Sequence, residues 1–132
     1  MMLAQARKFV LILEDELLIA MELATLVENM GFAVLGPAGS CQEALTLLQS
    51  QKPDAAIIDI LVRDETCEHV VDDLDRLGVP WAVCTGFRPS SLDPRYRTAQ
   101  VIQKPLSSAN VEHLLSALID QVSETSQHDV SL

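Results

Sequence analysis

The sequence lacks long apolar runs and is poor in basic residues. No segment approaches the ~18 consecutive apolar residues of a membrane-spanning helix, and the first residues, MMLAQARKF, lack the apolar core of a signal peptide. Lysine and arginine total 9 against 19 acidic residues, which gives a net charge of −10, whereas nucleic-acid binding needs a basic face that neutralises phosphates. We therefore expect a cytoplasmic protein with no membrane insertion and no nucleic-acid partner.

Cysteine is scarce, and so are signs of a second domain. Cys41, Cys67 and Cys84 are odd in number and have no metal-ligand spacing, so we interpret them as small buried or half-buried free thiols. There is no internal repeat and no linker, and the 132 residues are 48% apolar, which is enough for one packed core. We predict a single domain over 1–132, with its core at about 8–123 and a polar tail at 124–132.

The chain alternates short apolar runs with amphipathic segments of helical spacing. The apolar runs predict five strands, near residues 9–13, 33–37, 55–59, 81–84 and 101–103. Such alternation is typical of a parallel sheet covered on both faces, here an α/β, doubly wound, flavodoxin-like fold with strand order 2-1-3-4-5. The connection 86–100 contains two prolines and no apolar stripe, so we expect its helix to be short or absent.

Polar side chains follow four of these strands at the point where each ends: Glu14-Asp15, Asp59, Thr85 and Lys104. The carboxyl ends of parallel strands share one edge, where ligands bind, and strands 1 and 3 are neighbours in the predicted order. Taken singly, each residue has an ordinary alternative: Asp15 as a helix cap, Thr85 as a strand residue, Lys104 as a solvated surface side chain. Their joint placement predicts a site for a divalent cation and a phosphoryl group.

Clustered carboxylates repel one another unless a positive charge joins them. Mg²⁺ prefers oxygen ligands and typically uses one or two carboxylates together with a phosphate oxygen. We expect Asp15 and Asp59 to be direct ligands, Glu14 to act through water, and the backbone carbonyl of Leu61 to supply a further oxygen.

A carboxylate can also attack phosphorus and form an aspartyl-phosphate. Asp59 is the best candidate because it ends the central strand of the predicted sheet. Lys104 and the metal would neutralise charge on the transferring group, and the hydroxyl of Thr85 would donate to a phosphoryl oxygen.

Over about residues 8–123 the chain resembles the receiver domain of bacterial two-component response regulators. The matching pieces are LILEDE with its acidic pair, AAIIDI with Asp59, the strand-end Thr85, and the pair Lys104-Pro105. The resemblance implies that Asp59 accepts a phosphoryl group from a histidine kinase or a histidine phosphotransfer protein, with Mg²⁺ held by the acidic pair and Asp59. It also implies that Lys104 pairs with the phosphoryl group and that Thr85 follows it.

The segment 80–87, PWAVCTGF, is similar to the Pro-Phe-x-Phe-Ala-Thr-Gly-Tyr motif of the subgroup nicknamed FAT GUY, which often consists of stand-alone receivers. Receivers typically carry a switch aromatic where this chain has Val101, and Phe87 is the nearest aromatic that could replace it. By the same resemblance, Leu61 and Phe87 flank the line of attack on the phosphoryl group. Two bulky apolar side chains there predict slow hydrolysis of the phosphorylated state.

Three apolar residues of the first predicted helix, Leu17, Leu18 and Met21, lie off its buried stripe. Exposed apolar side chains beside a site often mark a partner surface, so these residues and Pro105 are candidates for docking the kinase. The alternative for the helix residues is that they form the rim of a small core.

Four functions compete. The leading one is a stand-alone receiver, not an enzyme beyond its own phosphorylation and slow dephosphorylation, which signals to a downstream protein by binding. The alternatives within this class are a phosphate sink and a phosphorylation-independent binding module; the kinase, the target and the oligomeric state stay open. A haloacid-dehalogenase-like hydrolase would carry a second Asp as general acid two residues after Asp59, where this chain has Leu61.

Overall fold

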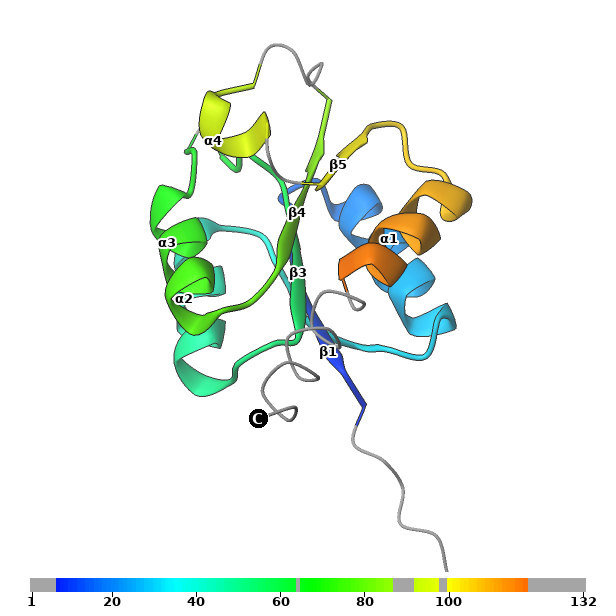
Figure 1. Cartoon of the computed structure of the whole chain (residues 1–132), viewed down its shortest axis with the longest axis horizontal. Helices are drawn as coiled ribbons and strands as arrows, with labels where there is room; N and C mark the ends of the chain where they lie inside the picture. The colour runs from blue at the N-terminus through cyan, green and yellow to red at the C-terminus, as the bar shows by residue number, and fades with distance from the viewer. Residues whose placement is uncertain (1–6, 64, 87–91, 98–99, 119–132) are drawn as a thin grey trace, which may run out of the picture.

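The computed structural model describes residues 7–63, 65–86, 92–97 and 100–118 (Figure 1). Its centre is a five-stranded sheet in the order β2-β1-β3-β4-β5, and every neighbouring pair is parallel. The strands are β1 (Phe9–Leu13), β2 (Ala33–Ala38), β3 (Ala55–Ile58), β4 (Trp81–Thr85) and β5 (Gln100–Gln103). The predicted fold class and strand order are confirmed.

Helices cover both faces of the sheet. They are α1 (Leu17–Asn29), α2 (Cys41–Ser50), α3 (Glu68–Leu77), α4 (Pro94–Arg97) and a further helix that begins at residue 108 and runs to at least 118. In Figure 1, α2 and α3 lie on one side of the sheet, with α1 and the helix from residue 108 on the other. Among the described residues no helix is long and apolar enough to span a membrane. The predicted tail 124–132 lies outside the described residues.

The two sides of the sheet have separate cores because successive residues of a strand point to opposite faces. In β1, Leu11 and Leu13 pack into the core beneath α2 and α3. Val10 and Ile12 pack on the other face, in the core beneath α1 and the last described helix. Burial on both faces explains why β1 and β3 are continuous apolar runs.

Local sequence signals fix the helix ends. The hydroxyl of Ser40 accepts a hydrogen bond from the Glu43 amide at 3.1 Å and so caps α2. The carboxylate of Glu43 accepts a hydrogen bond from the Gly39 amide at 2.8 Å. In a standard capping box the donor would be the amide of the next residue, the cap residue Ser40 itself. At the C-terminal end of α3, Gly78 has φ 72°, the left-handed conformation that ends many helices.

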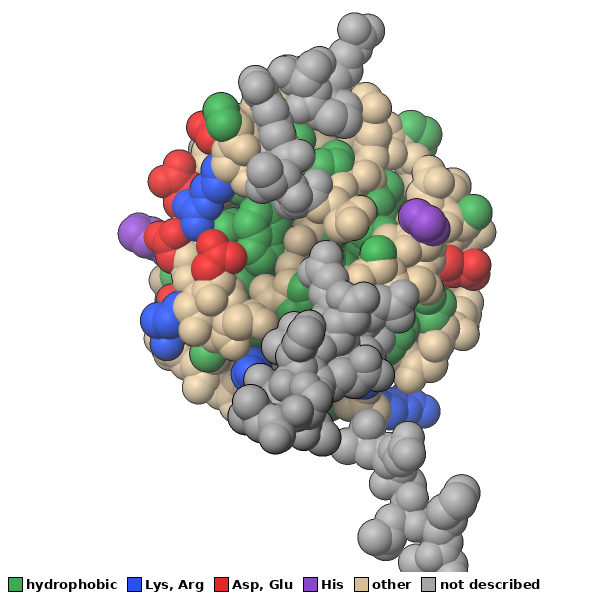
Figure 2. Space-filling view, viewed as in Figure 1, with side chains coloured by type: hydrophobic (Ala, Val, Ile, Leu, Met, Phe, Trp, Pro, Cys, Tyr) green, Lys and Arg blue, Asp and Glu red, His purple; other side chains and the backbone are tan. Residues whose placement is uncertain are grey.

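The predicted short fourth helix is confirmed: α4 has four residues. It is attached to α3 by Arg95, whose guanidinium lies 2.7 Å from Asp72 and 3.5 Å from Asp75. Trp81 donates to Asp75 at 2.8 Å and meets the ring of Tyr96 edge-on, with 6.1 Å between ring centroids. Acidic and basic side chains gather over α3 in Figure 2. Exposed ion pairs of this kind contribute about 1 kcal/mol or less each.

The prediction of three free thiols is wrong for two of them. Cys41 and Cys67 form a disulfide, with Cα atoms 5.3 Å apart and a sequence separation of 26. Cys84 is free and buried, as predicted. The pairing depends on the packing of α2 beside α3 and on the left-handed backbone of Cys67, with φ 51°. Neither can be read from cysteine spacing.

Candidate functional site

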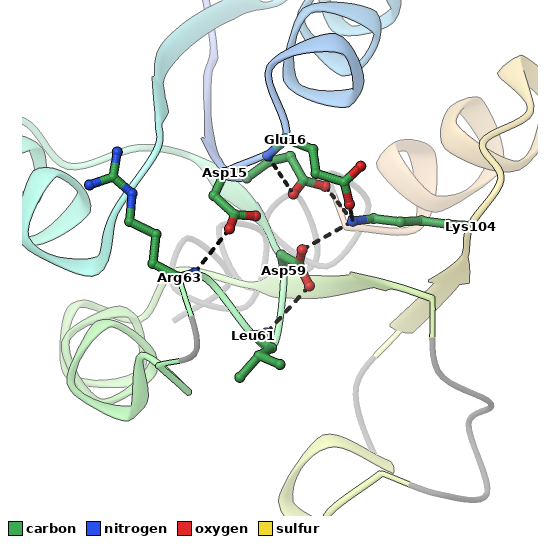
Figure 3. Close-up of polar contacts among 7 residues, drawn as sticks. Asp15, Glu16, Asp59, Leu61, Arg63 and Lys104 are labelled. Atoms are coloured by element: carbon green, nitrogen blue, oxygen red, sulfur yellow. Dashed lines mark hydrogen bonds and ion pairs between the residues drawn. The ribbon is translucent and has the colours of Figure 1, made fainter.

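The predicted carboxylates meet at the carboxyl edge of the sheet. Leu13 and Ile58 are paired as the last residues of β1 and β3, and the Asp59 amide continues this pairing by donating to the Leu13 carbonyl at 2.9 Å. The residues that follow each strand are therefore side by side. One carboxylate oxygen from each of Glu14, Asp15 and Asp59 lies within 4.8 Å of the other two, as the strand order predicts. Figure 3 shows Asp15 and Asp59 of this cluster.

Lys104 enters this cluster from the end of β5 (Figure 3). Its Nζ lies 2.6 Å from Oε1 of Glu14, 3.0 Å from Oδ2 of Asp59 and 3.7 Å from Oε1 of Glu16. Its backbone amide donates to the Thr85 carbonyl at 2.7 Å, which holds the backbone of Lys104 against the end of β4. One ammonium group therefore faces three carboxylates, while Asp15 lies beside them.

The electrostatics of the cluster reflect burial and excess negative charge. Glu14 is only 2% exposed, and burial raises the pKa of Glu14 to about 7, with Asp59 adding to the rise and Lys104 opposing it. Burial lowers the pKa of Lys104, but the adjacent carboxylates of Glu14 and Asp59 outweigh this and leave that pKa above its ordinary value. The lysine therefore stays protonated, and the site favours additional positive charge.

The residues fit a hard divalent cation. Oε1 of Glu14 is buried and accepts no hydrogen bond, so its contact with Lys104 is an ion pair by distance. The amide of Arg63 donates to Oδ2 of Asp15 at 2.9 Å and is the main cause of a lowered pKa for Asp15, which keeps that carboxylate charged at neutral pH. Glu14, Asp15 and Asp59 together offer the oxygen ligands that Mg²⁺ prefers.

The loop after β3 folds back on the Asp59 carboxylate. The amide of Leu61 lies 3.4 Å from Oδ1 of Asp59, a long contact that holds the backbone of Leu61 beside the cluster (Figure 3). The use of its carbonyl as a metal ligand stays a prediction.

The structure describes Thr85 and one of the two predicted switch residues, Val101. Thr85 ends β4 and is fully buried, directly beside the backbone of Lys104. Val101 is half-buried in β5 and packs against the core beneath α3. Phe87 lies outside the described residues, so its role stays a prediction.

Sequence reasoning missed two contributors to the site. Glu16 is the third acid of the LILEDE run, so its sequence position was an available signal for its approach to Lys104. Arg63 contributes through its backbone, in a left-handed conformation with φ 50°. No side-chain pattern predicts a donated backbone amide.

The candidate docking residues are exposed, as predicted. Leu17, Leu18 and Met21 are 71%, 81% and 56% exposed in the first turns of α1, and Pro105 is exposed next to Lys104. Because α1 begins directly after Glu16, this apolar patch borders the acidic cluster.

Known proteins are similar to this chain in sequence and fold, although no family model matches the chain. The transcriptional regulatory protein PdtaR of Mycobacterium tuberculosis is 32% identical over 110 residues, covering 83% of this chain and 54% of PdtaR. The structure of the response regulator PhyR from Brucella abortus is similar at 30% identity and a TM-score of 0.79, covering 95% of this chain and 54% of that one. The structure of SdrG from Sphingomonas melonis is 33% identical with a TM-score of 0.77, covering 88% and 99%. The chain spans about half the length of the curated relatives it matches.

Proposed function

From the chain's membership of the receiver domains of response regulators, we propose that it accepts a phosphoryl group on Asp59 in a Mg²⁺-dependent reaction and signals by binding other proteins. One observation carries this proposal: the Asp59 carboxylate lies 3.0 Å from the Lys104 ammonium and within 4.8 Å of oxygens of Glu14 and Asp15. A nucleophile, a fixed cation and a set of metal ligands thus meet around one carboxylate.

In the proposed reaction an oxygen of Asp59 attacks phosphorus, and the bond from phosphorus to the nitrogen of a donor phosphohistidine breaks. When bound, Mg²⁺ supplies positive charge to the transferring group. Lys104 contributes a second positive charge, and its ion pairs hold the ammonium in place before the donor arrives. Leu61 stands where an aspartyl-phosphate hydrolase needs a general acid, so the product is a phosphorylated protein that persists as a signal.

The donor is a histidine kinase or a histidine phosphotransfer protein, and the site of action is the cytoplasm, where such donors hold their phosphoryl groups. Related chains support a protein target for the phosphorylated state: PhyR from Bartonella quintana is described as an anti-anti-sigma factor, and SdrG has been seen in a BeF3-activated conformation. We propose that this chain likewise binds a downstream protein more tightly once phosphorylated, which is a population shift between two states.

Acetyl phosphate with Mg²⁺ tests the central claim directly. The intact mass of the parent protein should rise by one phosphoryl group, and the Asp59→Asn variant should gain nothing because its amide is not a nucleophile. Chelation of Mg²⁺ by EDTA should prevent the gain in the parent. A parent protein that stays unmodified in the presence of Mg²⁺ would falsify the proposed function.

The exposed apolar patch gives a second prediction. Leu17→Asp should slow phosphotransfer by about tenfold, measured with a histidine kinase that phosphorylates the parent protein. The reason is that a charge in the centre of a docking surface removes apolar contact. Labelling by acetyl phosphate should be unchanged, since that small donor needs no docking. Asn29→Asp, which adds the same charge at the exposed far end of α1, is the control. Equal rates of phosphotransfer from the kinase to the two variants would show that the patch is not part of the docking surface.

A further inference from the structure

The disulfide between Cys41 and Cys67 ties two helix beginnings together. Cys41 is the first residue of α2, and Cys67 is the residue immediately before α3. The Cys67 backbone is left-handed, a conformation that non-glycine residues adopt uncommonly. The bond thus secures a turn that the backbone alone does not favour.

This turn ends the loop that carries the site. The loop, described over residues 60–63 and 65–67, follows Asp59. It includes Leu61, whose amide lies near the Asp59 carboxylate, and Arg63, whose amide donates to Asp15. The structure therefore anchors the loop at one end to β3 and at the other end to α2 through the disulfide. Reduction of the disulfide would therefore loosen both backbone contacts of the loop with the acidic cluster, from Leu61 to Asp59 and from Arg63 to Asp15.

We propose that Cys41 and Cys67 form a reversible redox site, whose oxidation holds the loop against Asp15 and Asp59 and so favours Mg²⁺ binding and phosphorylation. The effect on phosphorylation and the cytoplasmic setting rest on the proposed function; the bond between Cys41 and Cys67 does not. Disulfides of mesophilic cytosolic proteins are usually transient and serve catalysis or redox sensing. A bond placed at the end of the site loop matches such a sensor.

The surroundings of the two sulfurs favour exchange. Cys41 and Cys67 are 9% and 7% exposed, and the residues on the C-terminal side of each are exposed, so the bond lies just beneath the surface. A cysteine in the first turn of a helix is more readily a thiolate, the form that attacks a disulfide. Cys84 differs, because burial raises its pKa to about 12, and it takes no part.

The exchange needs a small disulfide, such as oxidised glutathione, as the oxidant. The Cys41 thiolate attacks one glutathione sulfur, which forms a mixed disulfide and expels one glutathione thiolate. The Cys67 thiolate then attacks the Cys41 sulfur and expels the second. The two thiol protons pass to the two released glutathiones, so Cys41 and Cys67 are oxidised by two electrons and one glutathione disulfide is reduced. Excess reduced glutathione runs both steps backwards.

Oxidation should tighten Mg²⁺ binding through loop order. In the reduced protein the Cys67 turn can relax, so the loop must be ordered when the metal binds, and that cost weakens the affinity. We expect the oxidised protein to bind Mg²⁺ at least about threefold more tightly than the reduced protein.

The first measurement tests the site without metal or phosphate. The protein is equilibrated in glutathione buffers of increasing oxidation, denatured, alkylated and weighed. The three cysteines should all react under reducing conditions, and only Cys84 should react under oxidising conditions. Cys84→Ser, the matched control, should give the same midpoint, whereas Cys41→Ser should lose the transition. Three reactive thiols in every buffer would overturn the redox site.

The second measurement tests the coupling in the unmutated chain. Amide hydrogen exchange of Leu61 and Arg63 in Mg²⁺-free buffer should be slower in the oxidised form, and Mg²⁺ titration should show the difference in affinity. Equal exchange and equal affinity in the two forms would overturn the coupling. If acetyl phosphate modified neither form while the exchange still differed, the proposed function would fail and the redox site would stand.

Discussion

Replacing Lys104 with methionine should lower the free energy of unfolding in Mg²⁺-free buffer by about 2 kcal/mol, because it leaves buried carboxylates without their cation. Glu14 and Asp59 are 2% and 7% exposed, and both lie within 3.0 Å of the ammonium. The edge of the site is open to solvent, so the loss should be smaller than for a fully buried ion pair. Phosphorylation by acetyl phosphate should slow by at least about tenfold, since the fixed positive charge is gone.

Urea unfolding with and without Mg²⁺ distinguishes this electrostatic effect from a simple packing defect. Mg²⁺ should stabilise Lys104→Met by more than it stabilises the parent, because the cation then meets less opposing charge and binds more tightly. Adding Asp59→Asn should recover part of the loss by removing one unpaired carboxylate. Lys52→Met, at an exposed position, is the matched control. A loss in Lys104→Met that neither Mg²⁺ nor Asp59→Asn reduces would contradict the electrostatic account.

The fold was predictable because its signals are local and repeated. The apolar runs of β1 and β3 are buried on both faces, so they stand out from the amphipathic helices around them. Once the strands are known, the handedness of the connections leaves few topologies. The strand order then places Asp15 beside Asp59 without any long-range signal in the sequence. The two prolines of 86–100 likewise indicated the short α4.

The parts that sequence reasoning missed depend on packing or on the backbone. The Cys41–Cys67 bond joins residues that meet only when α2 lies beside α3. The amide of Arg63 reaches Asp15 through a left-handed turn, and backbone donors leave no side-chain pattern. Glu16 is different: its position after Glu14 and Asp15 was visible, but only the reach of the Lys104 side chain shows that a third acid shares the cation.

The persistence of the phosphorylated state should depend on Leu61. This residue is 37% exposed, follows Asp59 by two positions, and is held there by the contact of its amide with the Asp59 carboxylate. An apolar side chain beside Asp59, the proposed acceptor, offers no hydrogen bond to an attacking water. In Leu61→Asn, the amide can hold a water near the phosphoryl group, and orienting a nucleophile in this way accelerates its attack. We expect hydrolysis of the phosphorylated protein to become about tenfold faster.

The measurement isolates hydrolysis from loading. Each protein is phosphorylated with acetyl phosphate, freed of the donor by rapid desalting into saturating Mg²⁺, and weighed at intervals. Leu61→Met, which keeps an apolar side chain of similar volume, should match the parent lifetime and controls for a change of shape alone. If Leu61→Asn decays at the parent rate, water access is not set at this position. If both variants decay faster, the cause is altered packing of the loop after Asp59. Only a short lifetime confined to the asparagine variant supports exclusion of water by Leu61.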